Sequence, residues 1–293
     1  MNKRTAAVVV TYNRKDYLLR SVHALLGQSV PVDVLVVDNA STDGTAEALQ
    51  PLLSDRVQYY NTGSNLGGAG GFQYGTRLAV QAGYDLLWLM DDDCIPERSA
   101  LEALLKADEE LAGNYGFLSG LAYWKDGSLC NMNIQKTGIK SKIEDLSSPL
   151  VPVIMATFVS VLIPSERVRE VGLPIKEFFI WSDDLEYTRR LSRKWPCYVV
   201  TGSRALHDMK SNDKVNIATD SADRLGRYAY LYRNEVYVYR REGIKGWLYL
   251  LPRVCLHLVK VLLKSDHKWK KMKVILSSFF AGFRFKPAIE YVD

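Results

Sequence analysis

The first ninety residues alternate between short apolar runs and segments with the composition of helices, and this alternation limits the possible folds more than any other feature of the chain. Apolar runs without polar interruption indicate strands that are buried on both faces, as in parallel sheets covered by helices. The predicted strands cover residues 6–12, 32–38, 57–60 and 85–90, and the predicted helices cover residues 16–26, 41–49 and 71–81. The sequence therefore predicts an α/β fold with a Rossmann-like, mainly parallel, doubly wound sheet.

Polar residues follow each of these four predicted strands. Ligands of such sheets bind beyond the carboxyl ends of the strands. We therefore expect the four polar clusters to line one crevice. The clusters are Thr11 to Asn13, Asp38 with Asn39, Asn61 to Gly71, and Asp91 to Asp93.

The second half of the chain has a less regular pattern. Strands are predicted over residues 116–124, 158–163 and 197–202, and helices over residues 183–193 and 222–241. The stretch from Asp208 to Ala222 is polar and is predicted to be a loop. These features predict a catalytic α/β domain over residues 1–222 and a helical, basic, amphipathic appendage over residues 223–293.

The basic character of the chain is concentrated near its end. Residues 260–286 contain eight Lys or Arg and one Asp, a sum of +7, so that with a net charge of +5 the rest of the chain sums to about −2. This distribution favours a local anionic partner and argues against a nucleic-acid-binding body. Apolar and aromatic residues precede the lysines, which is typical of a segment in a membrane interface. The alternative is a packed helix pair with a solvated basic face.

Signals for secretion are weak in this chain. The apolar stretch before Tyr12 is too short for a signal peptide. Residues 247–263 are interrupted by Pro252, Arg253, His257 and Lys260, so no uninterrupted apolar run is expected to span a bilayer. The four cysteines form no C-x-x-C pair, which favours reduced thiols in the cytosol.

Three adjacent aspartates, Asp91, Asp92 and Asp93, come directly after the apolar run LLWLM. Adjacent carboxylates repel one another and are costly to desolvate, and a divalent cation relieves both costs. Oxygen ligands suit Mg²⁺ or Mn²⁺, which usually also hold substrate phosphates. A solvated acidic turn that caps the next helix is the alternative, but the position after a buried strand favours a metal site.

The segment TGSNLGGAGGFQYG holds six glycines in fourteen residues and leads into a predicted helix. Glycine permits close backbone approach, and a helix N-terminus can hold a phosphate or a sugar. The segment is neither a P-loop nor a dinucleotide fingerprint, because it lacks the Lys-Ser/Thr pair and follows the third strand. A flexible loop without a ligand is the alternative.

A second acidic group lies in the segment FFIWSDDLEYTRR. Asp183, Asp184 and Glu186 fall near the start of a predicted helix, where carboxylates often only complement the helix dipole. Apolar and aromatic neighbours would instead raise the pKa of a carboxylate toward that of a general base. Both interpretations remain open on the pattern alone. His207 follows the strand CYVVTG, and it is either a structural histidine or a third ligand beside two carboxylates.

The opening VVVTYNRKDYLLRSVHALLGQS, the stretch VVDNASTDGT and the LMDDD motif resemble glycosyltransferase family 2, whose members have a GT-A fold. The resemblance covers roughly residues 5–240. Together with WSDDLE and the later histidine, NLGGAGGF looks most like bacterial galactofuranosyltransferases and envelope rhamnosyltransferases. One departure matters: Ser182 separates Trp181 from Asp183, where those galactofuranosyltransferases have W-D-D.

The resemblance implies a role for each matching residue. Asp91, Asp93 and His207 match the metal site, which would hold Mn²⁺ or Mg²⁺, and Asp92 would lie against the donor. Asp184 matches the general base, although Ser182 leaves a choice between Asp183 and Asp184. Trp181 and Glu186 are expected at the acceptor. The remaining expected donor-binding residues are Thr11, Asn13, Arg14, Asp38, Asn65, Gly68, Gly70 and Gly71.

The function that follows is inverting transfer of a sugar from a nucleotide-diphospho-sugar to a hydroxyl of a cell-envelope glycan or lipid-linked acceptor. UDP-galactofuranose is the first choice of donor and dTDP-rhamnose the second. The expected location is cytoplasmic, peripheral on the inner face of the cell membrane, without a nucleic-acid partner. A sugar nucleotidyltransferase would need a glycine-rich loop where TYNRKDY stands. A non-catalytic, membrane-attached sugar-binding module is the alternative from another class.

Overall fold

A computed structural model describes residues 3–213 and 215–292. The N-terminal half forms four parallel strands in the spatial order β3-β2-β1-β4. These strands are β1 (Thr5–Thr11), β2 (Asp33–Asp38), β3 (Val57–Asn61) and β4 (Leu86–Asp91). Their helices are α1 (Lys15–Leu26), α2 (Thr45–Leu49), the 3-10 turn η1 (Gln50–Leu52) and α3 (Gly67–Gln81).

The two faces of these strands are both buried, which explains their continuous apolar sequence. Along β1, Val8 and Val10 belong to the apolar core on one face of the sheet, and Ala7 and Val9 belong to the core on the other. The strand ends are in register: Thr11 pairs with Asp38, Asp38 with Asn61, and Val10 with Asp91. The predicted convergence of the strand ends is therefore confirmed.

The second half extends the same sheet beyond β4, with the order β4-β8-β6-β9-β5 and with β7 paired to β9. The strands are β5 (Cys94–Pro96), β6 (Leu118–Tyr123), β7 (Leu150–Pro152), β8 (Val159–Pro164) and β9 (Tyr198–His207). The helices are α4 (Ala100–Glu110), α5 (Ser165–Val171), the 3-10 turn η2 (Lys176–Phe178) and α6 (Asp183–Ser192).

The α/β architecture is as predicted, but the sheet is mixed rather than mainly parallel. Strand β8 runs antiparallel to both of its neighbours, and β5 and β7 run antiparallel to β9. The regular alternation of strand and helix ends here: β5 follows β4 after two residues, and a long loop over residues 124–149 joins β6 to β7.

Two predicted boundaries shift in ways that matter for the site. Helix α3 begins at Gly67 rather than at Gly71, so most of the glycine-rich turn is helical. Strand β9 continues to His207, which places this histidine at the end of a strand rather than in the loop after it.

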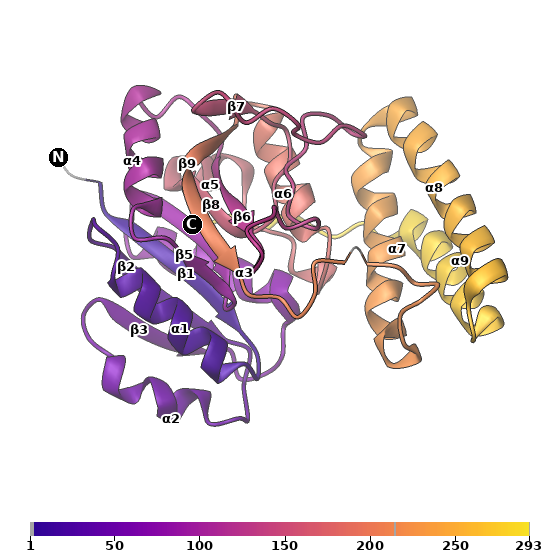
Figure 1. The fold of residues 1–293 in the computed structure, drawn as a ribbon, viewed down its shortest axis with the longest axis horizontal. Coiled ribbons are helices and arrows are strands. Elements are labelled where there is room, and N and C mark those ends of the chain that lie inside the picture. The colour runs from indigo at the N-terminus through magenta and orange to yellow at the C-terminus, as the bar shows by residue number, and fades with distance from the viewer. Residues whose placement is uncertain (1–2, 214, 293) are drawn as a thin grey trace.

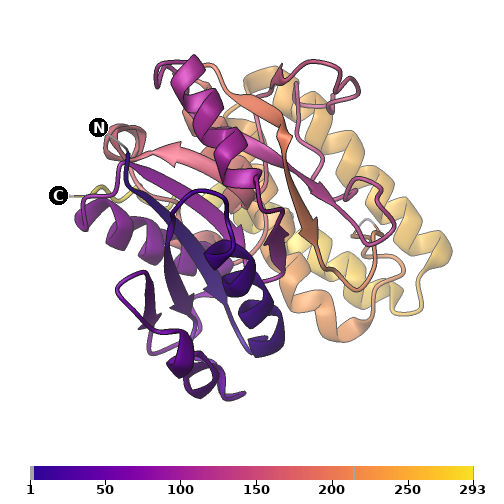
Figure 2. The same ribbon diagram turned by 60° about the vertical axis from the view of Figure 1, so that its left-hand side comes forward.

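The C-terminal region is a group of helices beside α6, at the side of the molecule away from β2 and β3 (Figure 1). Its elements are the 3-10 turn η3 (Ala222–Arg224), α7 (Leu225–Arg240), α8 (Gly243–Lys264) and α9 (Lys268–Arg284). The three helices share an apolar core that includes Tyr232, Val254 and Ile275. Figure 2 shows α8 and α9 behind the sheet in the rotated view. The division of the chain at residues 222 and 223 stays a prediction.

Helix α8 corrects one expectation from the sequence. Within the residues that the structure describes, this one helix is long and apolar enough to cross a membrane by length and composition. Pro252 lies inside the helix without ending it. Arg253 and His257, which were expected to break the apolar run, instead contact α7.

Candidate active site

Backbone pairing brings His207 to the aspartate run. Strand β4 ends at Asp91, and β5 begins only three residues later. In the antiparallel pair of β5 and β9, Cys94 lies opposite His207. The N–H of Asp208 donates to the carbonyl of Asp93 over 2.9 Å, which extends this pairing by one step. The histidine and the aspartates, more than 110 residues apart in the chain, therefore meet through sheet register.

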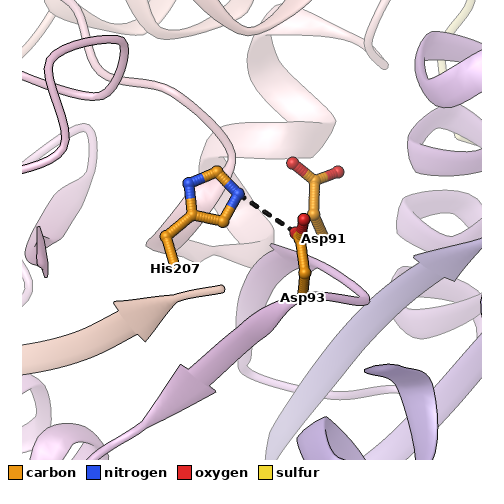
Figure 3. A group of neighbouring side chains, drawn as sticks. All are labelled: Asp91, Asp93 and His207. Atoms are coloured by element: carbon orange, nitrogen blue, oxygen red, sulfur yellow. Dashed lines mark hydrogen bonds and ion pairs between the residues drawn. The ribbon is translucent and has the colours of Figure 1, made fainter. Parts of the chain in front are cut away.

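Asp91, Asp93 and His207 form a compact group of side chains (Figure 3). Their possible ligand atoms all lie within 4.8 Å of one another, and His207 Nε2 is 3.0 Å from Asp93 Oδ1. Burial raises the pKa of Asp91 well above its usual value, and the charges of Asp93 and Asp92 raise it further. Such a concentration of negative charge favours a bound cation.

Asp92 and Asp93 also share a guanidinium. Arg14 Nη1 lies 3.0 Å from Asp92 Oδ1, and Arg14 Nη2 donates to Asp93 Oδ2 over 2.7 Å. Thr11 Oγ1 donates to Asp92 Oδ2 over 2.8 Å. Burial raises the pKa of Asp92 to about 7, despite the opposing charge of Arg14. Burial acts in the same direction on Asp93, but His207 and Arg14 outweigh it and lower the pKa of Asp93 to about 2.

Asn133 fixes the orientation of the His207 ring. Its Oδ1 lies 2.8 Å from His207 Nδ1, and its Nδ2 donates to Thr157 Oγ1 over 2.8 Å. The bond to Thr157 leaves the amide oxygen facing the imidazole, so Nδ1 carries the proton. The other ring nitrogen, Nε2, faces Asp93, where a bound cation would take the place of its proton. The donor set therefore fits Mn²⁺ or Mg²⁺ in both chemistry and spacing.

We expect Asn133→Ala to weaken the affinity for Mn²⁺ by roughly 10–100-fold, since partners that orient a ligand histidine typically contribute that much. The change in the thermal unfolding temperature on titration with Mn²⁺ measures the affinity without any sugar. Asn114→Ala, in an exposed turn, is the matched control. An unchanged affinity in Asn133→Ala would mean that Asn133 does not position the ring.

Asp183 and Asp184 begin helix α6, and their charges act on the aspartate run. The charges of both residues contribute to the raised pKa of Asp91, after burial and the charges of Asp93 and Asp92. Burial raises the pKa of Asp183 to about 8, and the charge of Asp184 adds to the effect. Burial also raises the pKa of Asp184, but the N–H of Leu185 and the charge of Lys136 limit the rise to about 6. Asp184 is therefore the more readily ionised member of the pair.

The segment that leads into α6 has an uncommon backbone. Phe179, Trp181 and Ser182 have φ angles of 61°, 66° and 67°, in the left-handed region that few side chains adopt. Several such residues together cost free energy and persist only when their surroundings hold them. This strained segment, residues 179–182, sets the direction in which Asp183 and Asp184 enter the site.

Asn234 of helix α7 holds the strained segment. Its Nδ2 lies within hydrogen-bond distance of the carbonyls of Phe178, Ile180 and Trp181, at 3.0, 3.2 and 2.9 Å. Asn234 is fully buried. A side chain from the helical region thus fixes the backbone that precedes the acidic pair of the α/β domain.

We expect Asn234→Ala to cost about 2–3 kcal/mol of unfolding free energy, because it leaves buried carbonyls without a donor. Transfer activity should fall by more than the fraction of unfolded protein explains, since residues 179–182 lose their restraint. Asn234→Asp has almost the same shape but cannot donate, so it should fail as well. Denaturant unfolding and initial rates on the folded fraction provide the two measurements. Full activity in folded Asn234→Asp would contradict this role.

The glycine-rich segment is explained mainly by packing. A side chain at Gly71 would lie 2.5 Å from Val10, and one at Gly70 would lie 2.5 Å from Leu66 in the preceding turn. At Gly67, whose φ is +71°, a Cβ would lie 2.1 Å from the Phe179 carbonyl oxygen. Gly68 has open space around it. Asn65 Oδ1 accepts the Gly67 N–H over 2.8 Å and so shapes the first turn of α3.

Hydrogen bonds join the polar loops that follow β1 and β2. Asp38 is fully buried: its Oδ1 accepts the Ser41 N–H over 2.8 Å, and its Oδ2 accepts the Tyr59 hydroxyl over 2.7 Å. Asn13, with φ of 54°, accepts the Thr42 N–H over 2.7 Å. The buried Asp38 therefore holds the loop after β2 in place. A nucleotide-binding role for Asp38 and Asn13 stays a prediction.

The two predicted acceptor residues differ in their surroundings. Trp181 is half-buried and packs edge-on against Tyr228, with ring centroids 5.4 Å apart. Glu186 is buried and paired with Arg190 at 2.7 Å. Arg190 also donates to the carbonyl of Val171. An acceptor role for Glu186 stays a prediction, and this ion pair favours a structural role.

Solved structures with the same arrangement of elements are glycosyltransferases. The chain aligns with S. aureus TarS residues 1–349 with a TM-score of 0.56 and 13% identity, covering 97% of this chain and 72% of that one. It aligns with GalNAc-T7, solved with UDP, GalNAc and Mn²⁺, with a TM-score of 0.63 and 14% identity, covering 96% and 56%. A mannosyltransferase from Pyrobaculum calidifontis, solved with GDP-Man and Mn²⁺, gives a TM-score of 0.55 at 13% identity, covering 98% and 76%. The fold is the GT-A glycosyltransferase fold.

Sequence comparison also finds relatives among glycosyltransferases. Residues 6–119 match the model of glycosyl transferase family 2. Over 283 residues the chain is 28% identical to galactofuranosyltransferase GlfT1 of Mycobacterium tuberculosis, covering 86% of this chain and 91% of the relative. Over 108 residues it is 34% identical to an undecaprenyl-phosphate mannosyltransferase of Micrococcus luteus, covering 36% and 44%. Residues 6–119 thus resemble glycosyltransferase family 2, and the predicted resemblance to galactofuranosyltransferases is confirmed.

Proposed function

We propose that the protein is an inverting glycosyltransferase that moves galactofuranose from UDP-galactofuranose to a hydroxyl of a cell-envelope glycan or lipid-linked acceptor. The observation that carries this proposal is the meeting of two acidic groups. Asp91, Asp93 and His207 lie together where β4 and β9 end, and the charges of Asp183 and Asp184, at the start of α6, add to the raised pKa of Asp91. A leaving-group site opposite a base is the arrangement that a single displacement needs.

In this proposal Asp91, Asp93 and His207 would hold Mn²⁺ or Mg²⁺, and Asp92 is not a ligand. When bound, the cation supplies neutralising charge for a diphosphate leaving group. The engagement of Asp92 by Arg14 and Thr11 supports its exclusion from the ligand set. Arg14 would also meet the negative charge of the donor. The further donor-binding residues that we propose are Thr11, Asn13, Asp38, Asn65, Gly68, Gly70, Gly71 and Asp92.

We assign the general base to Asp184, with Asp183 as the alternative. Asp184 would take the proton from the acceptor hydroxyl, which attacks the anomeric carbon from the side opposite the diphosphate. The configuration of that carbon then inverts. Asp184 is partly exposed whereas Asp183 is buried, and burial raises the pKa of Asp184 less than that of Asp183. Trp181 would contribute an apolar surface for the acceptor.

The choice of donor rests on the relatives named galactofuranosyltransferase, which cover most of the chain. dTDP-rhamnose is the second candidate. Incubation of the protein with Mn²⁺ and either donor should release the nucleoside diphosphate only from the correct one. NMR of the transferred sugar then reports the anomeric configuration. Retention of configuration would overturn the inverting mechanism, and donor binding without any release would favour a sugar-binding module.

We also propose a cytoplasmic location, peripheral on the inner face of the membrane. The charge of residues 260–286, which sum to +7, supports attraction to anionic lipid. Lipid-linked acceptors would be available at the same surface.

A further inference from the structure

The middle turns of helix α8 point their polar side chains inward, unlike those of an ordinary surface helix. Arg253 pairs with Glu235 of α7 at 3.0 Å, and His257 Nδ1 lies 2.9 Å from the Tyr232 hydroxyl. The exposed lysines of α8, Lys245 and Lys264, lie near its two ends. A helix at a water-facing surface shows the opposite arrangement, with its polar residues outward.

The outward face of α8 is apolar along its whole length. Its residues recur every three or four positions, which places them on one side of the helix. They are exposed, with exposed fractions from 46% to 79% among the aliphatic members. This face consists of Ile244, Leu248, Leu251, Cys255, Val259 and Leu262. At about 1.5 Å per residue, it extends for roughly 30 Å.

Helix α9 continues this surface and adds cations to it. Trp269 is 82% exposed, and Leu276, Phe280 and Phe283 follow it on the same side of the helix. Trp247 of α8 stacks on Phe283 of α9 with centroids 5.5 Å apart, which joins the two helices. Three exposed lysines surround the tryptophan at positions 268, 270 and 273. We call the outward faces of α8 and α9 together the α8–α9 surface.

We propose that the α8–α9 surface docks into the interface of an anionic lipid bilayer, with α8 lying parallel to the membrane plane. Apolar side chains would enter the headgroup boundary, the tryptophan would lie at headgroup level, and the lysines would meet lipid phosphates. The inference rests on the proposed function only for the choice of the inner leaflet.

The geometry favours lying in the membrane over crossing it. A spanning α8 would have to leave α7, which would strand Glu235 and Arg253 without each other inside or beside the hydrocarbon. Docking parallel to the plane keeps every contact between α7 and α8. The exposed face alone then exchanges water for lipid.

The same surface is a poor fit to a second copy of the chain. A symmetric dimer through this surface would bring Lys268, Lys270 and Lys273 of both copies into one interface. Like charges opposed across an interface are unfavourable, whereas anionic headgroups complement them. Charge complementarity therefore selects lipid as the occupant.

Vesicle co-sedimentation of the full chain tests the docking. Binding should be strong to phosphatidylglycerol-containing vesicles and weak to pure phosphatidylcholine. Leu251→Glu together with Val259→Glu should weaken binding by more than about tenfold. Lys268→Gln, Lys270→Gln and Lys273→Gln together should weaken it on the order of a hundredfold, at about fivefold per lysine.

Matched controls lie on the α/β domain. Leu53→Glu changes an exposed leucine, and Lys106→Gln changes a lysine whose side chain is 77% exposed; both should bind as the wild type does. Thermal unfolding and donor binding show that each variant is folded. Equal binding by wild type and the double glutamate variant would overturn the proposal, whether or not the protein transfers sugar.

Cys255 reports the orientation of α8. It is the exposed member of the four cysteines and lies near the middle of α8, on the outward face. A fluorophore on Cys255 should be quenched better by shallow than by deep lipid-attached quenchers, since an interfacial helix lies about 5–10 Å into the boundary. A spanning helix would place it near the centre of a core about 30 Å thick and reverse the order. Deep quenching, or a Leu251-dependent dimer without vesicle binding, would also overturn the proposal.

Discussion

Asp184→Asn is expected to lower the transfer rate by roughly 10²–10⁴-fold, the usual contribution of a general base. The amide occupies the same space as the carboxylate but cannot accept the acceptor proton. Donor binding should stay close to that of the wild type, because the donor-binding residues that we propose lie at the strand ends. Initial rates with donor and acceptor, and donor-dependent thermal stabilisation, provide the two measurements.

The pH dependence of kcat/KM is a second test of Asp184 as the general base. The pKa of Asp184 is about 6, so kcat/KM should rise with pH, reach half its plateau near pH 6, and fall below that as the carboxylate takes up a proton. Asp183→Asn should cost far less, because Asp183, with a pKa of about 8, is already protonated at neutral pH and the amide resembles that state. If Asp183→Asn removes the activity and Asp184→Asn does not, the roles are exchanged.

Asp91→Asn is expected to stabilise the metal-free protein while it abolishes the response to Mn²⁺. Burial and the neighbouring carboxylates make the Asp91 charge unfavourable in the folded state. At neutral pH the unfolded chain ionises this group freely, so removing the charge should raise the unfolding temperature by a few degrees. In domains of 150–250 residues, 1 kcal/mol corresponds to about 2–4 °C. Transfer should be lost because the ligand set is broken.

Calorimetry with and without Mn²⁺ separates these two effects. The wild type should gain stability on addition of Mn²⁺, and Asp91→Asn should gain none. Asp55→Asn, at an exposed position, should leave both temperatures unchanged within a degree. A destabilised, metal-free Asp91→Asn would show that the aspartate run is stabilised by contacts rather than strained by repulsion.

Local sequence patterns were enough to predict the four parallel strands β1 to β4 and the positions where they end. Continuous apolar runs separated by helices define parallel neighbours, so the positions of Thr11, Asp38 and Asp91 followed from periodicity and from the rule for strand ends. The association of His207 with Asp91 and Asp93 came from family resemblance. In the structure it depends on the pairing of β5 with β9, which no local pattern encodes.

The residues that the sequence did not reveal act through distant contacts. Asn133 and Asn234 each support a site residue from a separate segment, and a lone asparagine carries no signal of its own in a sequence. Lys136 belongs with them, because its influence on Asp184 requires that two remote segments meet. The inward direction of Arg253 and His257 was equally hidden, since their positions on α8 read as interruptions of an apolar run.

The bond network of Asn234 limits how the chain can be divided. A cut between residues 222 and 223 would separate the strained segment, residues 179–182, from Asn234. It would also remove the contacts that residues near the C-terminus make with the α/β domain. Glu290 pairs with Arg77 at 2.6 Å, and its carbonyl accepts the Leu173 N–H over 2.7 Å. The helices are therefore part of the catalytic scaffold rather than an exchangeable anchor. A change to the proposed α8–α9 docking surface must therefore preserve the loop geometry before α6, because α7 carries both the contacts to α8 and the donor of Asn234.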